Sequence, residues 1–171
     1  MLPQYLTLSA TAVYLTGVLV GFYMDPPVKV VYPEVVLPPE LLEQTKGAQF
    51  YALARNNISV VLINLLGGFS LGILSLLNTF YNGVVLGYAF SVAMDHFPVP
   101  EILGHLLPHA IEIGAIILSC SLGLYMGSYI IKKMLLDNKS EFNYRMFTIH
   151  TALIMVIILT AAFLEVYISF S

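Results

Sequence analysis

The stretch MFTIHTALIMVIILTAAFLEVYIS, residues 146–169, decides the fold of this chain. It is apolar almost throughout and is interrupted by His150 and Glu165. A helix needs about 20 mostly apolar residues to cross the hydrocarbon core of a bilayer. This stretch is long enough to do so. It therefore predicts a membrane-spanning helix and an integral membrane protein.

Hydropathy along the rest of the chain predicts four more spans. The five predicted spans cover residues 4–24, 54–77, 80–96, 101–134 and 146–169. The composition agrees, because 58% of the 171 residues are hydrophobic and 10% are charged, whereas soluble domains carry about 25% charged residues. We predict a single integral membrane domain over residues 1–171, built as an all-α bundle in the lipid bilayer.

Residues 25–53 form the one sizeable segment predicted to lie outside the membrane. Its first part is Pro-rich and extended, and residues 38–55 predict an outer interfacial helix that has prolines at its start and runs into the second span. The orientation follows from the loop after the fourth span, because short cytoplasmic loops are rich in Lys and Arg. That loop holds Lys132, Lys133, Lys139 and Arg145. The N-terminus is then expected in the cytoplasm, and residues 25–53 and the C-terminus outside the cell membrane.

Several function classes fit the sequence poorly. The net charge is -3 and no basic patch is present, so nucleic acid is not an expected partner. The single cysteine, Cys120, excludes an intramolecular disulfide and a cysteine-based zinc site. The sequence GFSLG, residues 68–72, matches G-x-S-x-G but lies inside a predicted span rather than on a strand-to-helix turn. We expect no enzyme activity and no cofactor.

Small residues recur at every fourth position in three of the spans. Such rows let helix backbones approach closely in lipid. We expect them to pack the second, third and fourth spans together, and a homodimer interface is the alternative. The rows are Gly68 and Gly72, then Gly83, Gly87 and Ser91, then Ala115, Ser119, Gly123 and Gly127.

Polar side chains gather in what is predicted to be the outer half of the bundle. Ionisable groups in a membrane face a bundle interior or a cavity because lipid solvates them poorly. Arg55 is expected to pair with Glu112, since a guanidinium matches a carboxylate, and Glu165 is the alternative partner. Three interpretations stay open: a structural ion pair, the lining of a solute or ion path, or charges that reach the interface. The predicted cluster comprises Arg55, Asn56, Asn57, His109, Glu112 and Glu165.

A metal site is a weaker possibility in the fourth span. His105, His109 and Glu112 would share one face of a continuous helix and would suit zinc. Pro108 lies between the two histidines and is expected to break the helix there. We therefore expect no metal, and His109 is interpreted as a hydrogen-bonded residue in the first turn after the break. Proton transfer through His109 and Glu112 is an alternative.

Three segments together resemble the stage II sporulation protein M family. They are FYALARNNISVVLINLLGGFSLG, NTFYNGVVLGYAF and LLPHAIEIGAIILSCSLGLYMG, within residues 47–135. The matching elements are Asn56 and Asn57 leading a span, Gly68, Asn82 with Gly83, and Pro108-His109 with Glu112.

The resemblance implies a multi-span helical membrane protein without known catalytic activity. In spore-forming bacteria the namesake holds peptidoglycan-remodelling partners at the membrane. Relatives occur widely in organisms that make no spores, often beside transport components. We therefore expect a non-enzymatic scaffold that oligomerises or holds other membrane proteins. The alternative is a channel or transporter subunit for an ion or small solute that uses Arg55, His109 and Glu112. An intramembrane enzyme is a third and weaker hypothesis.

Overall fold

The computed structural model describes residues 2–24, 45–135 and 141–169. Every regular element within these ranges is helical. Five helices are long and apolar enough to cross a membrane, which confirms the predicted all-α, multi-span fold. They are α1 (Gln4–Tyr23), α3 (Lys46–Leu66), α4 (Ile73–Met94), α5 (Val99–Leu135) and α6 (Tyr144–Leu164). A 3₁₀ turn, η1 (Gly67–Ser70), follows α3, and a π-helical turn, η2 (Glu165–Ser169), follows α6.

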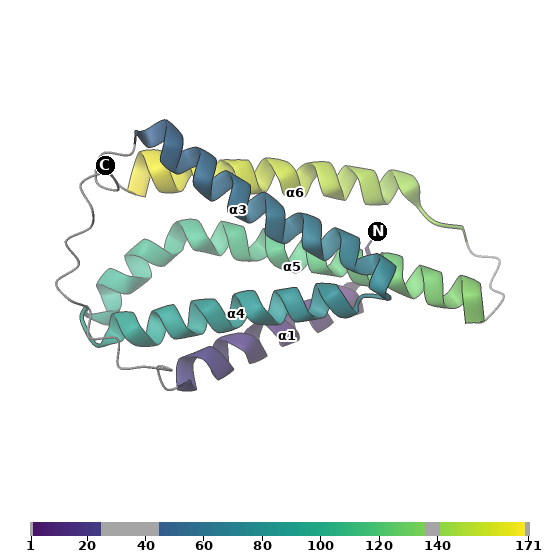
Figure 1. Cartoon of the computed structure of the whole chain (residues 1–171), viewed down its shortest axis with the longest axis horizontal. Coiled ribbons are helices and arrows are strands. Elements are labelled where there is room, and N and C mark those ends of the chain that lie inside the picture. Colours follow the sequence, from purple (N-terminus) through teal and green to yellow (C-terminus); the bar gives the residue numbers. More distant parts are fainter. Residues whose placement is uncertain (1, 25–44, 136–140, 170–171) are drawn as a thin grey trace.

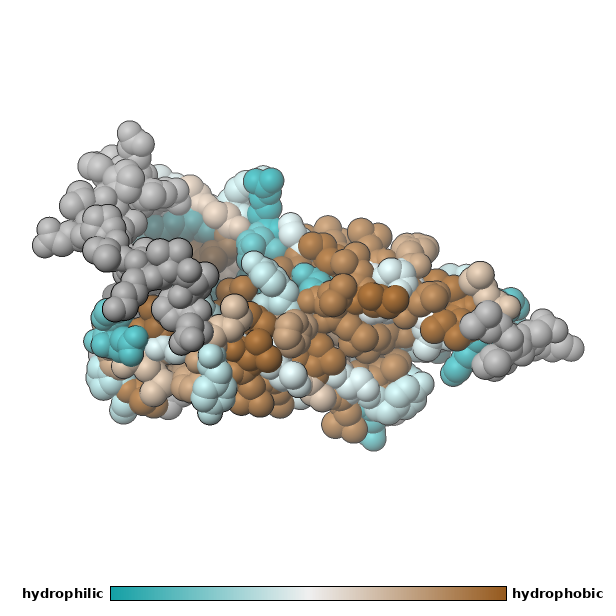
Figure 2. Space-filling model, turned by 60° about the horizontal axis from the view of Figure 1, so that its bottom comes forward, coloured by the Kyte–Doolittle hydropathy of each residue, from teal (hydrophilic) through white to brown (hydrophobic). Residues whose placement is uncertain are grey.

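Helix α5 lies at the centre of the bundle. It contacts each of the other described helices and both short turns. In Figure 1, α6 runs along one side of α5, α4 and α1 run along the other, and α3 crosses α5 from the α6 side toward α4. Hydrophobic residues cover most of the middle of the face shown in Figure 2, and several of the most hydrophilic residues lie near its two ends. An apolar surface of this kind matches a lipid environment.

The helix ends gather in two groups at opposite ends of the bundle (Figure 1). One end holds the last turn of α4 and is called here the Met94 end. The other holds the first turn of α6 and is called the Tyr144 end. Lys132 and Lys133 lie in the last turn of α5, and Arg145 lies in the first turn of α6. These three cations are therefore at the Tyr144 end, and Lys139 lies outside the described residues.

The predicted second span is wrong at its C-terminal boundary. Helix α3 begins at Lys46 with Thr45 as its cap, so residues 46–53 of the predicted interfacial helix continue into the span without a break, as expected. Residues 38–44 of that predicted helix lie outside the described residues. At its other end the span stops at Ser70, and the chain reverses through Leu71 and Gly72, which have φ of 59° and 92°. Because this turn is built from apolar residues, hydropathy runs across it without interruption.

Four glycines bring α1 and α4 into close contact. A Cβ atom on Gly21 would lie 2.0 Å from the carbonyl oxygen of Val84, and one on Gly87 would lie 2.0 Å from that of Val18. For Gly17 and Gly83 the corresponding distance to the facing carbonyl oxygen is 2.3 Å. Only hydrogen fits at these positions, as is typical of Cα–H···O contacts between helices. The predicted row Gly83–Gly87 therefore packs against α1, and not against the second or fourth span.

The glycine row of α5 packs against the α3–α4 hairpin. A Cβ atom on Gly123 would lie 2.1 Å from the carbonyl oxygen of Asn64, and one on Gly127 would lie 2.4 Å from the carbonyl carbon of Leu71. Gly68 in η1 faces Met126 of α5. For this row the predicted packing of the second, third and fourth spans is confirmed. Gly72 serves the reversal of the chain and is not part of a helical row.

The predicted helix break at Pro108 is wrong. Helix α5 is continuous from Val99 to Leu135 and passes through Pro108. Figure 1 shows a bend where the first turns of α5 meet the rest of the helix. Proline removes one intrahelical hydrogen bond and crowds the preceding turn, which kinks a helix without ending it when neighbouring helices support it. The bend leaves His109 and Glu112 on the same continuous helix.

Candidate functional site

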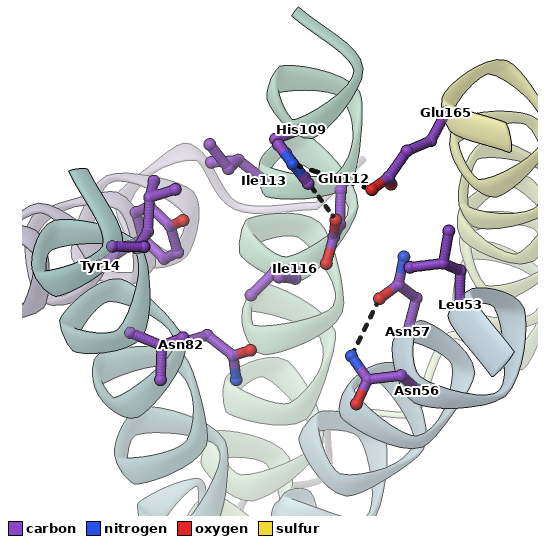
Figure 3. A pocket seen from close by; sticks show the side chains of 13 residues that line it. Tyr14, Leu53, Asn56, Asn57, Asn82, His109, Glu112, Ile113, Ile116 and Glu165 are labelled. Atoms are coloured by element: carbon purple, nitrogen blue, oxygen red, sulfur yellow. Dashed lines mark hydrogen bonds and ion pairs between the residues drawn. The ribbon is translucent and has the colours of Figure 1, made fainter. Parts of the chain in front are cut away.

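A pocket of about 270 Å³ lies in the half of the bundle nearer the Met94 end (Figure 3). Helices α1, α3, α4 and α5 and the turn η2 all contribute to its wall. The wall combines apolar side chains, most of them from α4 and α5, with amides, carboxylates and an imidazole. The lining residues are Tyr14, Leu53, Asn56, Asn57, Asn82, Val85, Leu86, Ala89, His109, Glu112, Ile113, Ile116 and Glu165.

Three titratable side chains meet in this pocket and are called here the His109 cluster: His109, Glu112 and Glu165. Nδ1 of His109 lies 3.4 Å from Oε2 of Glu112, and Nε2 lies 3.9 Å from Oε1 of Glu165. His109 and Glu112 share a face of α5 because they are three residues apart, and Glu165 comes from η2. Their side chains are 39%, 18% and 13% exposed, respectively. The imidazole therefore joins two half-buried carboxylates from separate helices.

Arg55 does not belong to this arrangement. Its side chain is exposed, and no ion pair joins it to Glu112 or Glu165 within the described structure. The reason is helical geometry, because residues turn by about 100° each around the helix axis. The buried residues of α3 are Ala54, Asn57, Val61, Asn64 and Leu65, and Arg55 falls on the opposite side. The predicted Arg55–Glu112 pair is wrong, and His109 is the partner of Glu112.

Asn57 is the most buried polar residue of the pocket wall, with 2% of its surface exposed. Nδ2 of Asn56 donates to Oδ1 of Asn57 over 3.2 Å, a contact within α3. Nδ2 of Asn57 is buried and has no hydrogen-bond partner in the described structure. Figure 3 shows the Asn57 amide directed toward the side of the pocket where Glu112 and Glu165 lie. A buried amide without a partner is uncommon in folded proteins.

The other predicted metal donor, His105, is on α5, one turn before His109. Its side chain lies outside the described structure. Within the described residues the three donors that approach one another come from His109, Glu112 and Glu165, all within 4.8 Å. The third donor is thus a carboxylate from the end of the chain and not the second histidine.

A hydrogen-bond network lies next to the pocket, on the side toward the Tyr144 end. It is called here the Asn64 network and comprises Asn64, Ser75, Asn78, Thr79 and Ser119. Nδ2 of Asn64 donates to Oγ of Ser119 over 2.9 Å and to the carbonyl of Ile116 over 3.2 Å. Its Oδ1 accepts from Nδ2 of Asn78 over 2.8 Å and from Oγ1 of Thr79 over 3.4 Å. The hydroxyl of Ser75 donates to the Asn64 carbonyl over 2.7 Å. Asn64 therefore links α3 to α4 and α5 by hydrogen bonds.

The network is continuous with the floor of the pocket. Asn82 and Ile116 both line the pocket. Nδ2 of Asn82 donates to the carbonyl of Asn78, and the Ile116 carbonyl accepts from Asn64. Of the network, Asn64, Ser75, Thr79 and Ser119 are fully buried.

Sequence reasoning missed most of this network, and it missed Tyr14 in the pocket wall. A usable signal was present in α4, where Ser75, Asn78, Thr79 and Asn82 recur at the spacing of one helix face. No comparable signal marks Tyr14, which is a single aromatic residue in an apolar span. The role of Gly17 and Gly21 was also missed, although they repeat at the same four-residue spacing as Gly83 and Gly87.

Comparison with known proteins agrees with the family resemblance seen in the sequence. A family model described as Stage II sporulation protein M matches residues 10–170. An uncharacterized protein of Methanocaldococcus jannaschii is 30% identical over 126 residues, which cover 70% of each of the two chains. No solved structure matches the chain at a significant level.

Proposed function

This chain belongs to the stage II sporulation protein M family, and on that premise we propose that it is a non-enzymatic scaffold that holds partner proteins at the cell membrane. The chain is a multi-pass membrane protein of this family. The observation that carries the scaffold role is the closure of the bundle at the Asn64 network. A scaffold needs a stable, closed membrane anchor, whereas a channel needs a continuous polar route.

The closure rests on named contacts. The pocket ends at Asn82 and Ile116, and the polar atoms below it are hydrogen-bonded to one another across α3, α4 and α5. Val61, Leu122 and Ile158 are fully buried in the hydrophobic core of the bundle. A second pocket, lined by Tyr5, Tyr125, Lys132 and other residues, lies toward the Tyr144 end. The Asn64 network and these core residues, called here the sealed layer, lie between the residues of α5 that line the two pockets.

The charge distribution supports an orientation for the scaffold. Lys132, Lys133 and Arg145 share the Tyr144 end, and cytoplasmic loops carry the excess of Lys and Arg. The Tyr144 end is then cytoplasmic, and the pocket and the Met94 end face outward. The N-terminus lies in the cytoplasm and the C-terminus outside.

Two measurements test the scaffold role. Proteoliposomes that contain the purified protein should leak K⁺, Na⁺ and protons no faster than protein-free vesicles. A photo-crosslinking residue placed at outward-facing positions, such as Leu15 of α1, Leu62 of α3 and Leu153 of α6, should give a discrete protein adduct from one face in native membranes. Lipid adducts alone from all three faces would contradict the proposal.

A channel or transporter subunit is the second candidate, and the pocket is the observation that favours it. A polar pocket with a partly buried His and two carboxylates is the kind of site that binds ions in transport proteins. This function requires that the sealed layer open during transport. It predicts an ion flux into liposomes that depends on the protein and that Glu112→Gln abolishes. Asp95 is an exposed carboxylate at the same end of the bundle, so Asp95→Asn should leave the flux unchanged.

A further inference from the structure

The His109 cluster has an excess of negative charge for its location. Within the described structure, the ion pairs of Glu112 and of Glu165 are both made with His109. A neutral imidazole leaves two negative charges, and a protonated imidazole leaves one. Carboxylates that are mostly shielded from water are unfavourable unless positive charge compensates them. The cluster therefore has room for at least one more positive charge.

The donor atoms form a ligand set for a divalent cation. One imidazole nitrogen and two carboxylate oxygens lie within 4.8 Å of one another. Metal–ligand distances for zinc are about 2.0–2.2 Å with these donors, so modest side-chain rotations would bring all three onto one ion. If Nε2 of His109 binds the ion together with Glu165, Nδ1 still faces Glu112. That carboxylate then either fixes the imidazole or binds the ion as well.

Asn57 supplies an independent indication of a ligand at the same place. Its buried Nδ2 has no partner, and its amide faces the carboxylates (Figure 3). The oxygen and nitrogen of an amide exchange places by a half-turn of the group. If Asn57 and the exposed Asn56 both turn, the Asn56–Asn57 hydrogen bond is kept with its direction reversed. Oδ1 of Asn57 would then face the cluster as a fourth donor, and the orphaned N–H would be satisfied.

The pocket also has room for an ion with part of its hydration shell. Its volume is about 270 Å³, and one water molecule occupies about 30 Å³ in the liquid. A mixed set of imidazole and carboxylate ligands suits Zn²⁺ and Mn²⁺, whereas Ca²⁺ prefers a shell of oxygen atoms.

We propose that His109, Glu112 and Glu165, together with the amide of Asn57, bind one divalent transition-metal cation, Zn²⁺ or Mn²⁺. This goes beyond the scaffold role and does not depend on it. It also reverses the expectation of no metal, which rested on a helix break at Pro108. The approach of Glu165 to His109 and Glu112 creates a donor set that the sequence alone did not reveal.

The test is metal binding to the full chain in nanodiscs after removal of bound metal with a chelator. Titration with Zn²⁺ and with Mn²⁺, followed by calorimetry and elemental analysis, should give one ion per chain for at least one of them. Glu112→Gln, Glu165→Gln and His109→Gln should each weaken binding by about 10-fold or more, a loss at least as large as that caused by outer-shell changes. Asn57→Leu should weaken it, and Asn57→Asp should preserve it.

Matched controls lie at the same end of the bundle. Asp95→Asn and His96→Gln remove an exposed carboxylate and an exposed imidazole outside the cluster, and both should bind as the wild type does. No stoichiometric binding of either ion to the wild type would overturn the proposal. Binding that Asp95→Asn or His96→Gln weakens as much as Glu112→Gln does would also overturn it, because the ion would then be adventitious at the surface.

A spectroscopic measurement on the wild type avoids any variant that fails to fold. X-ray absorption at the zinc edge should show one imidazole nitrogen, with oxygen atoms in the other positions and no sulfur. A shell with sulfur or with two or more imidazoles would contradict the assignment. Tighter binding of Ca²⁺ or Mg²⁺ than of Zn²⁺ and Mn²⁺ would refute the proposed class of cation. The flux assay tests the scaffold role separately, so one proposal can fail while the other stands.

Discussion

Nε2 of His109 on α5 lies 3.9 Å from Oε1 of Glu165 at the end of α6. This contact ties together the central helix and the last described turn of the chain. It places a carboxylate from the C-terminal region beside Glu112, which is on the same helix face as His109. The His109 cluster is therefore centred on an imidazole between two carboxylates, and Arg55 lies outside the cluster.

The position of Arg55 leads to a direct comparison of stabilities. Because its side chain is exposed, Arg55→Gln should change the free energy of unfolding by less than about 0.5 kcal/mol. His109→Phe leaves Glu112 and Glu165 without their partner and should destabilise the protein by about 1–2 kcal/mol. Unfolding in mixed detergent with a chelator present would measure both. A larger loss of stability for Arg55→Gln than for His109→Phe would indicate that Arg55 does pair with Glu112.

The α1–α4 contact predicts opposite effects for two glycine substitutions. Gly87→Ala would place a Cβ atom 2.0 Å from the Val18 carbonyl and should force the helices apart, at about 1–3 kcal/mol. Gly114→Ala is the matched control, because a Cβ atom there meets nothing within 4 Å. It should stabilise α5 by about 0.5–1 kcal/mol, the difference in helix propensity. Equal effects in the same unfolding assay would argue against close packing of α1 on α4.

The Asn64 network predicts that substitution of Asn64, at its centre, lowers the stability of the protein. Asn64→Leu removes the side-chain hydrogen bonds to Ser119 and Ile116 and the acceptor of Asn78. The expected loss is about 1–2 kcal/mol, in the range of hydrogen bonds between membrane helices. Ser59→Ala is a suitable control, because Ser59 is exposed and donates only within α3. An equal loss for the two variants would show that the network contributes nothing special.

The turn between α3 and α4 predicts that a glycine substitution in the turn raises stability and that one in the following helix lowers it. Leu71 has φ of 59°, a left-handed conformation that is unfavourable for a residue with a Cβ atom. Leu71→Gly should therefore raise stability by up to about 1 kcal/mol. The same change at Leu77, in the helical part of α4, should lower it by about 1 kcal/mol. Thermal unfolding of the two variants compares the signs, and a loss for Leu71→Gly would contradict the turn.

Which parts of the fold were predictable depended on the physical signal. Apolar runs identified all five spans, because length and hydropathy determine which helices cross a bilayer. The turn at Leu71 and Gly72 was missed because apolar residues build it, and a backbone reversal leaves no trace in hydropathy. Pro108 predicted a break, but support from neighbouring helices reduced it to a bend.

The candidate site was predictable in its composition more than in its contacts. His109, Glu112, Glu165, Asn56 and Asn57 do line one pocket, since buried polar groups in a membrane protein gather away from lipid. Which side chains pair depends on the rotation of each helix about its axis. A single sequence constrains that rotation only through the buried face, and on α3 that face excludes Arg55.

The native Cys120 offers the most direct test of the sealed layer on which the proposed function rests. It is the single cysteine of the chain and is fully buried, with its Sγ 3.5 Å from the Ser75 carbonyl. The measurement is labelling with a small charged thiol reagent, applied from both sides of native membranes, compared with Ile113→Cys in a Cys120→Ser background. Ile113 lines the pocket, so the account predicts labelling at position 113 and none at Cys120. Rapid labelling of Cys120 in the folded protein would contradict it and would mean that water passes through the bundle.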